Sequence, residues 1–478
     1  MKKVMNLAKW FYIIGIGLIF ASCKTPALVQ IPSAKPIPIY YTNSTDTSNA
    51  AQIHWSDFFA DKKLVALIDT AIQHNLDVLI TLQEIEVAKN KVRYVNGRLL
   101  PSITAGAGLG FDKVGTYTSQ GAGDASADIT PGNRVPEILG DQRLGFQASW
   151  EADIWGKLKN EKKAAFSRYL ETVEGKNLVV TSLVAEVANT YFELLALHNQ
   201  LNIINETIQL QKNGLEIVRF QKEANVVTEL AVKQFEAQLY NAQNLEFNVL
   251  QNITESENKL NFLLGRYPQK IEIDTTIFVQ SLPTVVKAGI PSQLLENRPD
   301  IKQAELELNA TKCDLNAVKA EFYPSLNIGA TLGVNAFKSN YLFRTPESII
   351  YSFMGDLSGP LVNKSAIIAA FKTANAFQIE AMYNYQKTIL NGFVEVSNQL
   401  SNIQNLEQSY LIKSKEVTSL NKSIEVSNDL FKSAKANYLE VLMTQKDALA
   451  SKLELIEVRK QQFNAITNIY KSLGGGWK

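Results

Sequence analysis

The side chains that most often carry out chemistry in proteins are few and scattered in this sequence. Its 478 residues include 3 histidines and 2 cysteines. His54, His74 and His198 are too far apart in the sequence for the spacing typical of a metal site. The sequence also has no pairing of a nucleophile with a base that would indicate a hydrolase. We therefore expect that the protein is not an enzyme and that it holds no metal and no cofactor.

Two glycine-rich runs could suggest a phosphate-binding loop, but neither has the right context. Gly106, Gly108 and Gly110 lie within an alternating segment rather than at a turn from a strand into a helix. The run from Gly474 to Gly476 lacks the Lys-Ser or Lys-Thr pair of such a loop. With 48 basic and 47 acidic residues, the net charge is +1, which gives no electrostatic reason to expect nucleic acid as a partner.

Three carboxylates stand in segments whose side chains alternate between two faces. Glu151 and Asp153 share the polar face of residues 143–154, and Asp356 lies on the polar face of residues 351–361. If these segments are strands in the wall of a pore, the three carboxylates face the lumen and can tune ion selectivity. The alternative is an ordinary solvated face.

The N-terminus has the features of a targeting segment. Lysines at the start precede an apolar stretch from Trp10 to Phe20, and Ala21-Ser22-Cys23 follows. This pattern resembles a bacterial lipoprotein signal, so we expect residues 1–22 to be a signal peptide and Cys23 to carry lipid. Residues 23–50 are rich in proline and are expected to form an extended, lipidated tether. The alternative is an ordinary signal peptide with an incidental cysteine; in the lipidated form, Cys313 has no partner for an internal disulfide.

Four segments have the period of a β-strand. Residues 99–111 (LLPSITAGAGLGF) and 322–334 (FYPSLNIGATLGV) repeat each other, and residues 143–154 and 351–361 also alternate. Each is about ten residues long, which is the length that a tilted membrane strand requires. After residue 22 no uninterrupted apolar run approaches the roughly 20 residues of a membrane-spanning helix. A mature chain that crosses a membrane must therefore use strands.

Two tracts are expected to be long helices. All 14 prolines avoid residues 137–267 and 361–478, and the apolar residues in these tracts recur with heptad spacing. A helix from near residue 157 to near residue 220 would be about 90 Å long. Each long helix is expected to turn back, near residues 222–228 and near residues 433–437, into a second helix. Asn437 and Glu440 have the spacing of an N-cap and its third helical residue.

Four strands are too few to close a membrane barrel. An open edge in lipid leaves backbone groups unpaired, at a cost of several kcal/mol each. Two, three or four copies of the chain would supply eight, twelve or sixteen strands, and small membrane barrels begin near eight. We therefore expect several copies to form one barrel, which the long helices extend as a tube on one side of the membrane.

The order of several motifs resembles the TolC-like outer-membrane efflux channels, in particular their lipoprotein branch. The motifs are Trp55 with Phe58 and Phe59, Pro101-Ser102, the run from Trp150 to Lys157, Leu263-Leu264-Gly265, Arg298-Pro299-Asp300 and the C-terminal run from Leu473 to Trp477. The Arg298-Pro299-Asp300 motif is also expected to shape the start of a helix. The resemblance covers nearly all of the mature chain. It implies a homotrimer with a twelve-strand barrel and a periplasmic tube of helical hairpins.

The resemblance also implies partners for the two hairpin turns. A periplasmic adaptor, which connects an inner-membrane pump to the tube, would contact residues 219–230 and 431–442. The residues concerned are Arg219, Asn225, Thr228, Glu229, Ala434, Asn437 and Glu440. A glycine common at such turns is replaced here by Asn225 and Ala434. Asparagine tolerates the left-handed conformation, whereas alanine tolerates it less well.

These observations predict a mainly helical protein with a membrane β-barrel and an internal two-fold repeat. The first repeat is residues 51–265, the linker is residues 266–290, and the second repeat, with a C-terminal equatorial segment, is residues 291–478. The expected function is that of an outer-membrane exit duct, which conducts small molecules passively from a pump and adaptor to the exterior. A type I protein-secretion exit channel and a non-conducting, lipid-anchored periplasmic scaffold are the alternatives.

Overall fold

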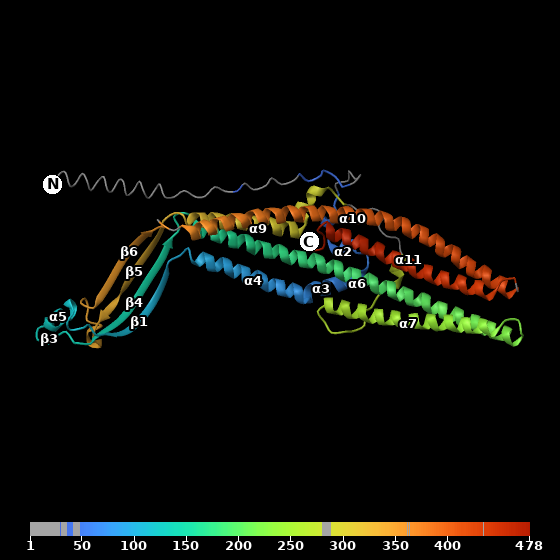
Figure 1. Ribbon diagram of the computed structural model, residues 1–478, viewed down its shortest axis with the longest axis horizontal. Coiled ribbons are helices and arrows are strands. Elements are labelled where there is room, and N and C mark those ends of the chain that lie inside the picture. Colours follow the sequence, from blue (N-terminus) through green and yellow to red (C-terminus); the bar gives the residue numbers. More distant parts are fainter. Residues whose placement is uncertain are drawn as a thin grey trace. The chain divides into compact units, whose positions relative to one another are not determined.

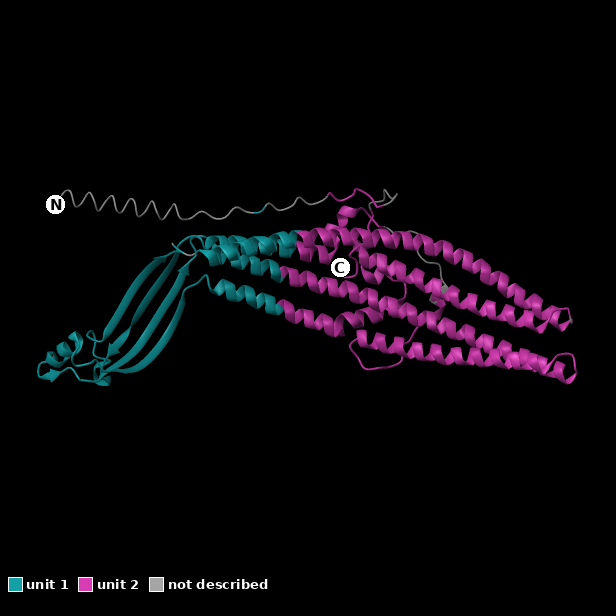
Figure 2. Ribbon diagram, in the orientation of Figure 1, with its two compact units in different colours: residues 1–32, 86–169, 306–382 teal, residues 33–85, 170–305, 383–478 magenta. Residues whose placement is uncertain are grey.

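A computed structural model describes residues 29, 36–41, 48–279, 288–360, 362, 364–433 and 435–478. The predicted signal peptide at residues 1–22, Cys23, most of the tether and Ala434 lie outside the described residues. The chain divides into two compact units (Figure 2). Unit 1 is residues 1–32, 86–169 and 306–382, and unit 2 is residues 33–85, 170–305 and 383–478.

Unit 1 contains the antiparallel sheet (Figure 1). Its strands are β1 (Ser102–Asp112), β4 (Leu139–Ala152), β5 (Ser325–Ala336) and β6 (Ile349–Ser358), in the order β1-β4-β5-β6. All four predicted strands are confirmed, to within a few residues at their ends. The connection from β1 to β4 carries a feature that the sequence analysis did not predict. It contains α5 (Ser119–Ser126) and a small hairpin of β2 (Asp128–Thr130) and β3 (Asn133–Arg134). A short 3-10 helix, η4 (Ser339–Tyr341), lies between β5 and β6.

Glycines allow the central strands of the sheet to approach closely. Gly145 of β4 lies opposite Gly333 of β5. A Cβ atom added to Gly333 would lie 2.8 Å from the Cα atom of Gly145, closer than such contacts occur. Side chains at these two positions would force the strands apart, which explains why both residues are glycine.

Long helices form most of the chain. These are α4 (Leu76–Gly97), α6 (Lys157–Glu223), α7 (Glu229–Leu263), α9 (Pro299–Ala320), α10 (Ser365–Lys432) and α11 (Tyr438–Ser472). The predicted long helix from near residue 157 is confirmed as α6, which runs 67 residues without a break. Both predicted turns are confirmed as well, because α6 ends at Glu223 before α7, and α10 ends at Lys432 before α11.

Corresponding helices in the two halves of the chain have nearly equal lengths. The helices before the sheet, α4 and α9, each have 22 residues. The helices after it, α6 and α10, have 67 and 68 residues, and the returning helices α7 and α11 each have 35. This correspondence supports the repeat that the strand segments suggested.

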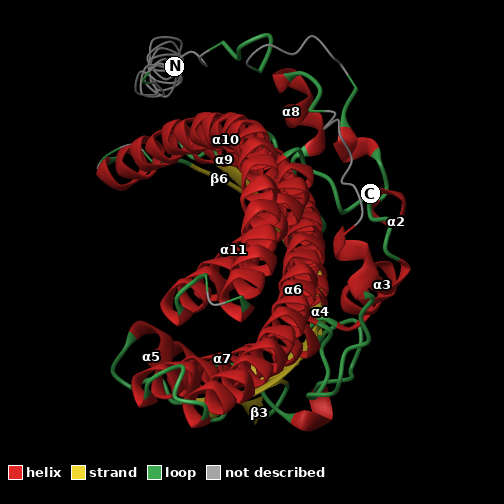
Figure 3. Cartoon of the chain, turned by 90° about the vertical axis from the view of Figure 1, so that its right-hand side faces the viewer, coloured by secondary structure: helices red, strands yellow, loops and turns green. Residues whose placement is uncertain are grey.

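The core of unit 2 forms where short elements cover the long helices. These elements are η1 (Ala50–Gln52), α2 (Trp55–Phe58), α3 (Lys62–His74), η2 (Thr275–Val279), η3 (Pro291–Gln293) and α8 (Leu294–Asn297). Leu64 and Ile68 of α3 are fully buried in the same apolar cluster as Tyr191 of α6. Figure 3 shows α3 beside the long helix α6. Burial of such a side chain contributes about 1.5–3 kcal/mol. The Tyr191 hydroxyl donates a 2.5 Å hydrogen bond to Asp61, whose carboxylate also caps α3.

Two helical stretches in the described residues could cross a membrane by length and composition, Lys62–Gly97 and Lys157–Glu223. In the second stretch, 67% of the 18-residue segment that meets this criterion is buried within the protein. Packing in the protein core therefore accounts for its apolar composition, as it does for the central helix of many soluble proteins.

Candidate functional site

The sheet of unit 1 has one apolar and one polar face. Strand register places Leu332 of β5 between Phe146 of β4 and Tyr351 of β6. These three side chains are 59%, 59% and 82% exposed, so none of the residues that the structure describes covers them. The same face continues along the strands with Ile103, Ala105, Ala107, Leu109, Ala148, Trp150, Ile328, Ala330, Val334, Ile349, Phe353 and Leu357. A broad, exposed apolar face on a sheet is typical of strands that contact lipid.

The opposite face is mainly polar, and two of the predicted carboxylates lie on it. Glu151 of β4 lies opposite Asn327 of β5, and Asn327 lies opposite Asp356 of β6. The three side chains therefore form one row across the sheet. The assignment of Glu151 and Asp356 to the lumen of a pore stays a prediction.

Asp153 has a different environment from the one that the alternating pattern predicted. Strand β4 ends at Ala152, so Asp153 lies beyond the sheet. Its carboxylate accepts hydrogen bonds from the backbone N–H groups of Leu158 and Lys159, at 2.9 and 3.0 Å. Free N–H groups at a helix start attract such a carboxylate. The alternation could not reveal this cap, because it depends on where the strand ends.

The two outer strands of the sheet are unpaired along one side. Within the described residues, β1 pairs with β4 alone and β6 pairs with β5 alone. Each outer strand thus presents a row of backbone N–H and C=O groups that need partners. The bilayer core contains no water to form hydrogen bonds with these groups, so in a membrane the two edges must pair with further strands.

The first hairpin turn has a helix ending that requires a left-handed residue. Asn225 has a φ angle of 61°, which is the left-handed conformation. The N–H of Val226 donates to the carbonyl of Gln221 at 2.8 Å, and the N–H of Asn225 donates to that of Lys222 at 2.9 Å. These bonds form a Schellman motif, in which glycine or asparagine is favoured. The prediction that Asn225 can replace glycine at this turn is confirmed.

Ion pairs join the two helices of the first hairpin. Lys222 of α6 lies 2.6 Å from Glu229 of α7, and Arg219 of α6 lies 2.8 Å from Glu236 of α7. The hydrogen bond from Lys222 holds the pKa of Glu229 below its usual range. Arg219 and Glu229 are among the residues predicted from the sequence, whereas their ion-pair partners Glu236 and Lys222 are not. Because α7 runs antiparallel to α6, residues at similar distances before and after the turn lie close together. This rule could have predicted both pairs from the sequence.

Thr228 lies at the same turn and is the residue before α7. Its backbone is extended, as expected for an N-cap, but its side chain makes no capping hydrogen bond. Around it Phe220, Val226 and Leu230 are exposed by 70%, 64% and 59%. The first turn therefore combines paired charges with uncovered apolar side chains.

The second hairpin turn is capped as the sequence predicted. The Asn437 side chain accepts a hydrogen bond from the N–H of Leu439 at 3.0 Å, and Glu440 lies in the first turn of α11. Between α10 and α11 next to this turn is a cavity of about 510 Å³. It is lined by Ser419, Lys422, Ser423, Val426, Ser427, Leu430, Ala436, Glu440 and Thr444.

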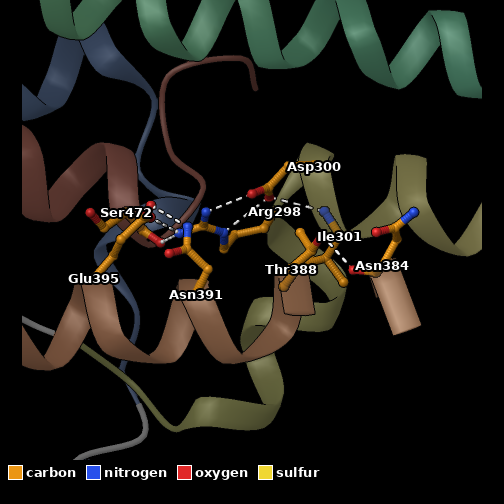
Figure 4. Close-up of polar contacts among 8 residues, drawn as sticks. All are labelled: Arg298, Asp300, Ile301, Asn384, Thr388, Asn391, Glu395 and Ser472. Atoms are coloured by element: carbon orange, nitrogen blue, oxygen red, sulfur yellow. Dashed lines mark hydrogen bonds and ion pairs between the residues drawn. The ribbon is translucent and has the colours of Figure 1, made fainter. Parts of the chain in front are cut away.

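Arg298 is the centre of a buried ion cluster in unit 2 (Figure 4). Its side chain is 7% exposed and donates hydrogen bonds to Asp300 at 2.6 and 3.0 Å and to Glu395 at 2.7 Å. It also donates to the carbonyl of Ser472 at 2.8 Å. Burial opposes the positive charge, but the two carboxylates outweigh it, so the pKa of Arg298 is raised. The cluster joins the start of α9 to α10 and to the end of α11.

The three histidines do not come together. His54 caps α2, and the ring of His74 forms a hydrogen bond with the carbonyl oxygen of Thr70 in α3. His198 lies in α6, where burial lowers its pKa. Within the described residues no group of His, Cys, Asp and Glu side chains could hold a metal ion.

A sheet with one exposed apolar face, together with long helical hairpins, is typical of membrane proteins that combine β-strands in the bilayer with helices outside it. Comparison with known proteins gives the family. The model of the outer membrane efflux protein family matches residues 67–266 and 290–475. The chain belongs to this family, and it is an outer-membrane efflux channel.

The sequences of individual relatives align with this chain over nearly their whole length. The cation efflux system protein CusC of Escherichia coli O6:H1 is 26% identical over 97% of this chain and 98% of its own. The pyoverdine export outer membrane protein OpmQ of Pseudomonas aeruginosa is 26% identical over 98% of this chain and 96% of its own. The probable outer membrane lipoprotein SilC of Salmonella typhimurium is 25% identical over 97% of this chain and 98% of its own.

Solved structures share the fold. The MtrE outer membrane channel of Neisseria gonorrhoeae, in its open state, superposes with a TM-score of 0.81. The match covers 95% of this chain and 98% of that one, at 21% identity. A membrane protein from Pseudomonas aeruginosa superposes with a TM-score of 0.83 at 23% identity, covering 95% and 97%.

Proposed function

We propose that three copies of the chain form a twelve-strand barrel that acts as the exit duct of a tripartite efflux system. The observation that supports this most directly is the sheet with two faces and two unpaired edges. Closure of the sheets of several copies pairs every edge, turns the apolar face to lipid and encloses the polar face. A barrel of this width has a water-filled interior, through which small solutes pass without further energy.

The cargo that we propose is small molecules rather than unfolded proteins. Relatives with similar sequences are named for the export of cations, of pyoverdine and of toluene, all of which are small. The variety of these cargoes indicates that the duct wall selects little, so selection falls to a pump. A type I protein-secretion exit is the rival channel.

We further propose that a periplasmic adaptor contacts the two hairpin turns. The exposed apolar residues and ion pairs of the first turn, and the cavity beside the second, are suitable for binding a partner's helical ends. The contact residues are Arg219, Asn225, Thr228, Glu229, Ala434, Asn437 and Glu440. An inner-membrane pump would complete the system.

The chain is proposed to consist of two structural repeats, residues 51–265 and 291–478, joined by a linker at residues 266–290. The nearly equal lengths of α6 and α10, and of α7 and α11, support this division. We also propose that residues 1–22 are removed and that Cys23 carries lipid. Substitution Cys23→Ser should abolish labelling by radioactive palmitate, and persistent labelling would refute the lipid assignment.

Conductance tests the duct directly. The purified full-length protein, reconstituted in planar bilayers, should give discrete conductance steps, at least in variants whose hairpin turns are mutated to open. Absence of any conductance in all of these variants would favour a non-conducting scaffold. Block of the steps by small cations or organic solutes, but not by unfolded polypeptide, would separate small-molecule export from protein secretion.

A further inference from the structure

Unit 1 carries a surplus of positive charge on α6 and α9, two of the four long helices that adjoin the sheet. The surplus consists of five lysines, here called the lysine patch: Lys159, Lys162 and Lys163 of α6, and Lys312 and Lys319 of α9. Within the described residues, none of the five forms an ion pair with a carboxylate. By contrast, the nearby carboxylates Glu307 and Asp314 both bind Arg168, at 3.1 and 2.7 Å.

The two helices that carry the patch lie side by side. The indole N–H of Trp155, just before α6, donates a 2.7 Å hydrogen bond to the carbonyl of Pro324, just after α9. The Trp155 ring also stacks on Tyr323, with ring centroids 4.8 Å apart. Burial raises the pKa of the Cys313 thiol on α9, and both Lys163 and Lys312 oppose this shift. The hydrogen bond, the stacked rings and the ion pairs of Arg168 hold α6 and α9 together, so the lysines of the two helices form one patch.

On α6 the patch lies on the side of the apolar face of the sheet. The ammonium group of Lys157 is 3.6 Å from the carboxylate of Glu151, which belongs to the polar face. An α-helix advances about 100° per residue, so Lys159 points about 200° away from Lys157. Lys163 and Phe166 follow on the same side at helical spacing, and Phe166 is 49% exposed.

On α9 the same separation occurs. Glu307 and Asp314 are seven residues apart and share one side of α9, where they bind Arg168. Glu321, just after the end of α9, lies 4.0 Å from Lys157. Lys312 and Lys319 are also seven residues apart, but they are rotated by about 140° from that side. Both are exposed. The paired Lys157 of α6 and the paired carboxylates of α9 therefore face one way, and the unpaired lysines of both helices face the other.

We propose that the lysine patch binds the headgroups of acidic phospholipids in the periplasmic leaflet of the outer membrane. The apolar face of the sheet contacts the acyl chains, and Trp155 and Tyr323 lie where that face ends, which is the usual depth of interfacial aromatic residues. Lysines just beyond this depth extend their ammonium groups to lipid phosphates. Asp153 already occupies the free N–H groups at the start of α6, so the lipid contact is made by the ammonium groups. The inference rests on the strands spanning the membrane, and it is independent of trimer formation and of the cargo.

Lipid retention by the full-length protein tests this proposal. The protein is incubated in mixed micelles of equal amounts of phosphatidylglycerol and phosphatidylcholine, recovered by affinity, and its bound lipids are counted. Wild-type protein should retain phosphatidylglycerol in excess, and the excess should fall as sodium chloride is raised, because salt screens surface charge. Each lysine near an anionic surface contributes a factor of about five to binding. Equal retention of the two lipids by the wild type would overturn the proposal.

A matched pair of variants locates the contact. Replacement of Lys159, Lys162, Lys163, Lys312 and Lys319 by glutamine should bring the lipid ratio close to parity. The control replaces five other exposed lysines, Lys212, Lys387, Lys415, Lys446 and Lys471, and changes the net charge equally; its lipid ratio should match that of the wild type. Loss of the excess in both variants, or in neither, would contradict the proposal.

Two further arms keep the test decisive. Replacement of the five patch lysines by arginine preserves the charge and should preserve the excess, so this variant gives a result even if the glutamine variant folds poorly. Loss of the excess in a folded arginine variant would contradict the proposal. Inorganic phosphate at millimolar concentration should leave the bound phosphatidylglycerol in place; its displacement by phosphate would identify a site for small anions and overturn the lipid assignment.

Discussion

At the scale of single residues, Arg298 has a larger structural role than its sequence motif indicated. The motif predicted the start of a helix, and α9 does begin at Pro299. The guanidinium group, however, binds Asp300, Glu395 and the carbonyl of Ser472, which are far apart in the sequence. Because it is almost fully buried, its charge depends on these partners.

Removal of this buried charge should be costly. Arg298→Ala leaves the carboxylates of Asp300 and Glu395 without their partner and should lower the free energy of unfolding by about 3–5 kcal/mol. The control Arg98→Ala breaks the more exposed pair with Glu161, whose side chains are 39% and 25% exposed, and should cost about 1 kcal/mol or less. Denaturant unfolding of the detergent-solubilised protein, followed by circular dichroism, measures both. Equal losses would show that the Arg298 cluster contributes no more than a surface pair.

Roles that depend on near neighbours in the sequence could be predicted, and roles that depend on distant contacts could not. Asn437 as a cap and Asn225 as a left-handed residue follow from local backbone chemistry, and the structure has both. The contacts of Arg298 with Glu395 and Ser472 require the complete fold of unit 2. The cap formed by Asp153 required knowledge of where β4 ends.

At the scale of elements, the two-residue period of the strands determines which side chains lie on the apolar face, which we propose contacts lipid. The register shows that neighbouring residues of one strand, such as Thr331 and Leu332, lie on opposite faces of the same sheet. A charge placed on the lipid face must lose its hydration, whereas a charge on a polar, wet face keeps it.

Lysine at neighbouring positions should therefore have unequal effects. Leu332→Lys should impair assembly in the membrane by about 2–4 kcal/mol if the residue is near the middle of the bilayer. Thr331→Lys, one residue away on the polar face, should have little effect. The yield of assembled, heat-resistant protein in membranes compares the two variants. A greater loss in Thr331→Lys would mean that the two faces are assigned the wrong way round.

The first hairpin offers a way to separate stability from partner binding. Glu229→Lys places two lysines together where Lys222 and Glu229 now pair, and it also reverses a charge at the proposed adaptor contact. The double variant Lys222→Glu with Glu229→Lys restores the pair in the reverse order. Both variants should weaken adaptor binding in pull-down assays, but only the single variant should make the turn more sensitive to protease. Normal adaptor binding by both would place the contact elsewhere.

The pH dependence of this hairpin follows from the lowered pKa of Glu229. A carboxylate with a lowered pKa in the folded state stabilises that state above its ordinary pKa, and this contribution disappears as the pH falls through the folded value. The Lys222–Glu229 pair should thus persist throughout the range from neutral pH to pH 5. The protection of backbone amides at the turn against hydrogen exchange, corrected for the intrinsic effect of pH, should therefore be the same at pH 7 and at pH 5. A loss of protection between these two pH values would contradict this expectation.

Most elements could be predicted, because long helices and alternating strands have strong periodic patterns. The clearest exception is the connection between β1 and β4, where α5, β2 and β3 are short and lie among glycines and small polar residues. Segments of this length do not show a reliable period. Their structure depends on local contacts, such as the close approach of Gly121 to the backbone of Gly115.

At the scale of the whole molecule, one chain has an incomplete membrane wall. Among the described residues, nothing pairs with the free sides of the two outer strands or covers the apolar face. We propose that copies of the same chain complete the sheet by pairing β1 of one copy with β6 of the next. The proposed three copies would give twelve strands, a width that would leave a wet interior lined by the row containing Glu151 and Asp356.

Cross-linking between the two outer strands tests this assembly most directly. In a Cys313→Ser background, Ala107→Cys on β1 is combined with cysteine at Tyr351, Phe353 or Leu357 on β6, and the protein is oxidised in its membrane. At least one pair should form disulfides between copies, giving dimers and trimers and nothing larger, because three copies close the ring. Monomers alone for every pair, or a ladder that continues beyond three copies, would contradict the proposed barrel.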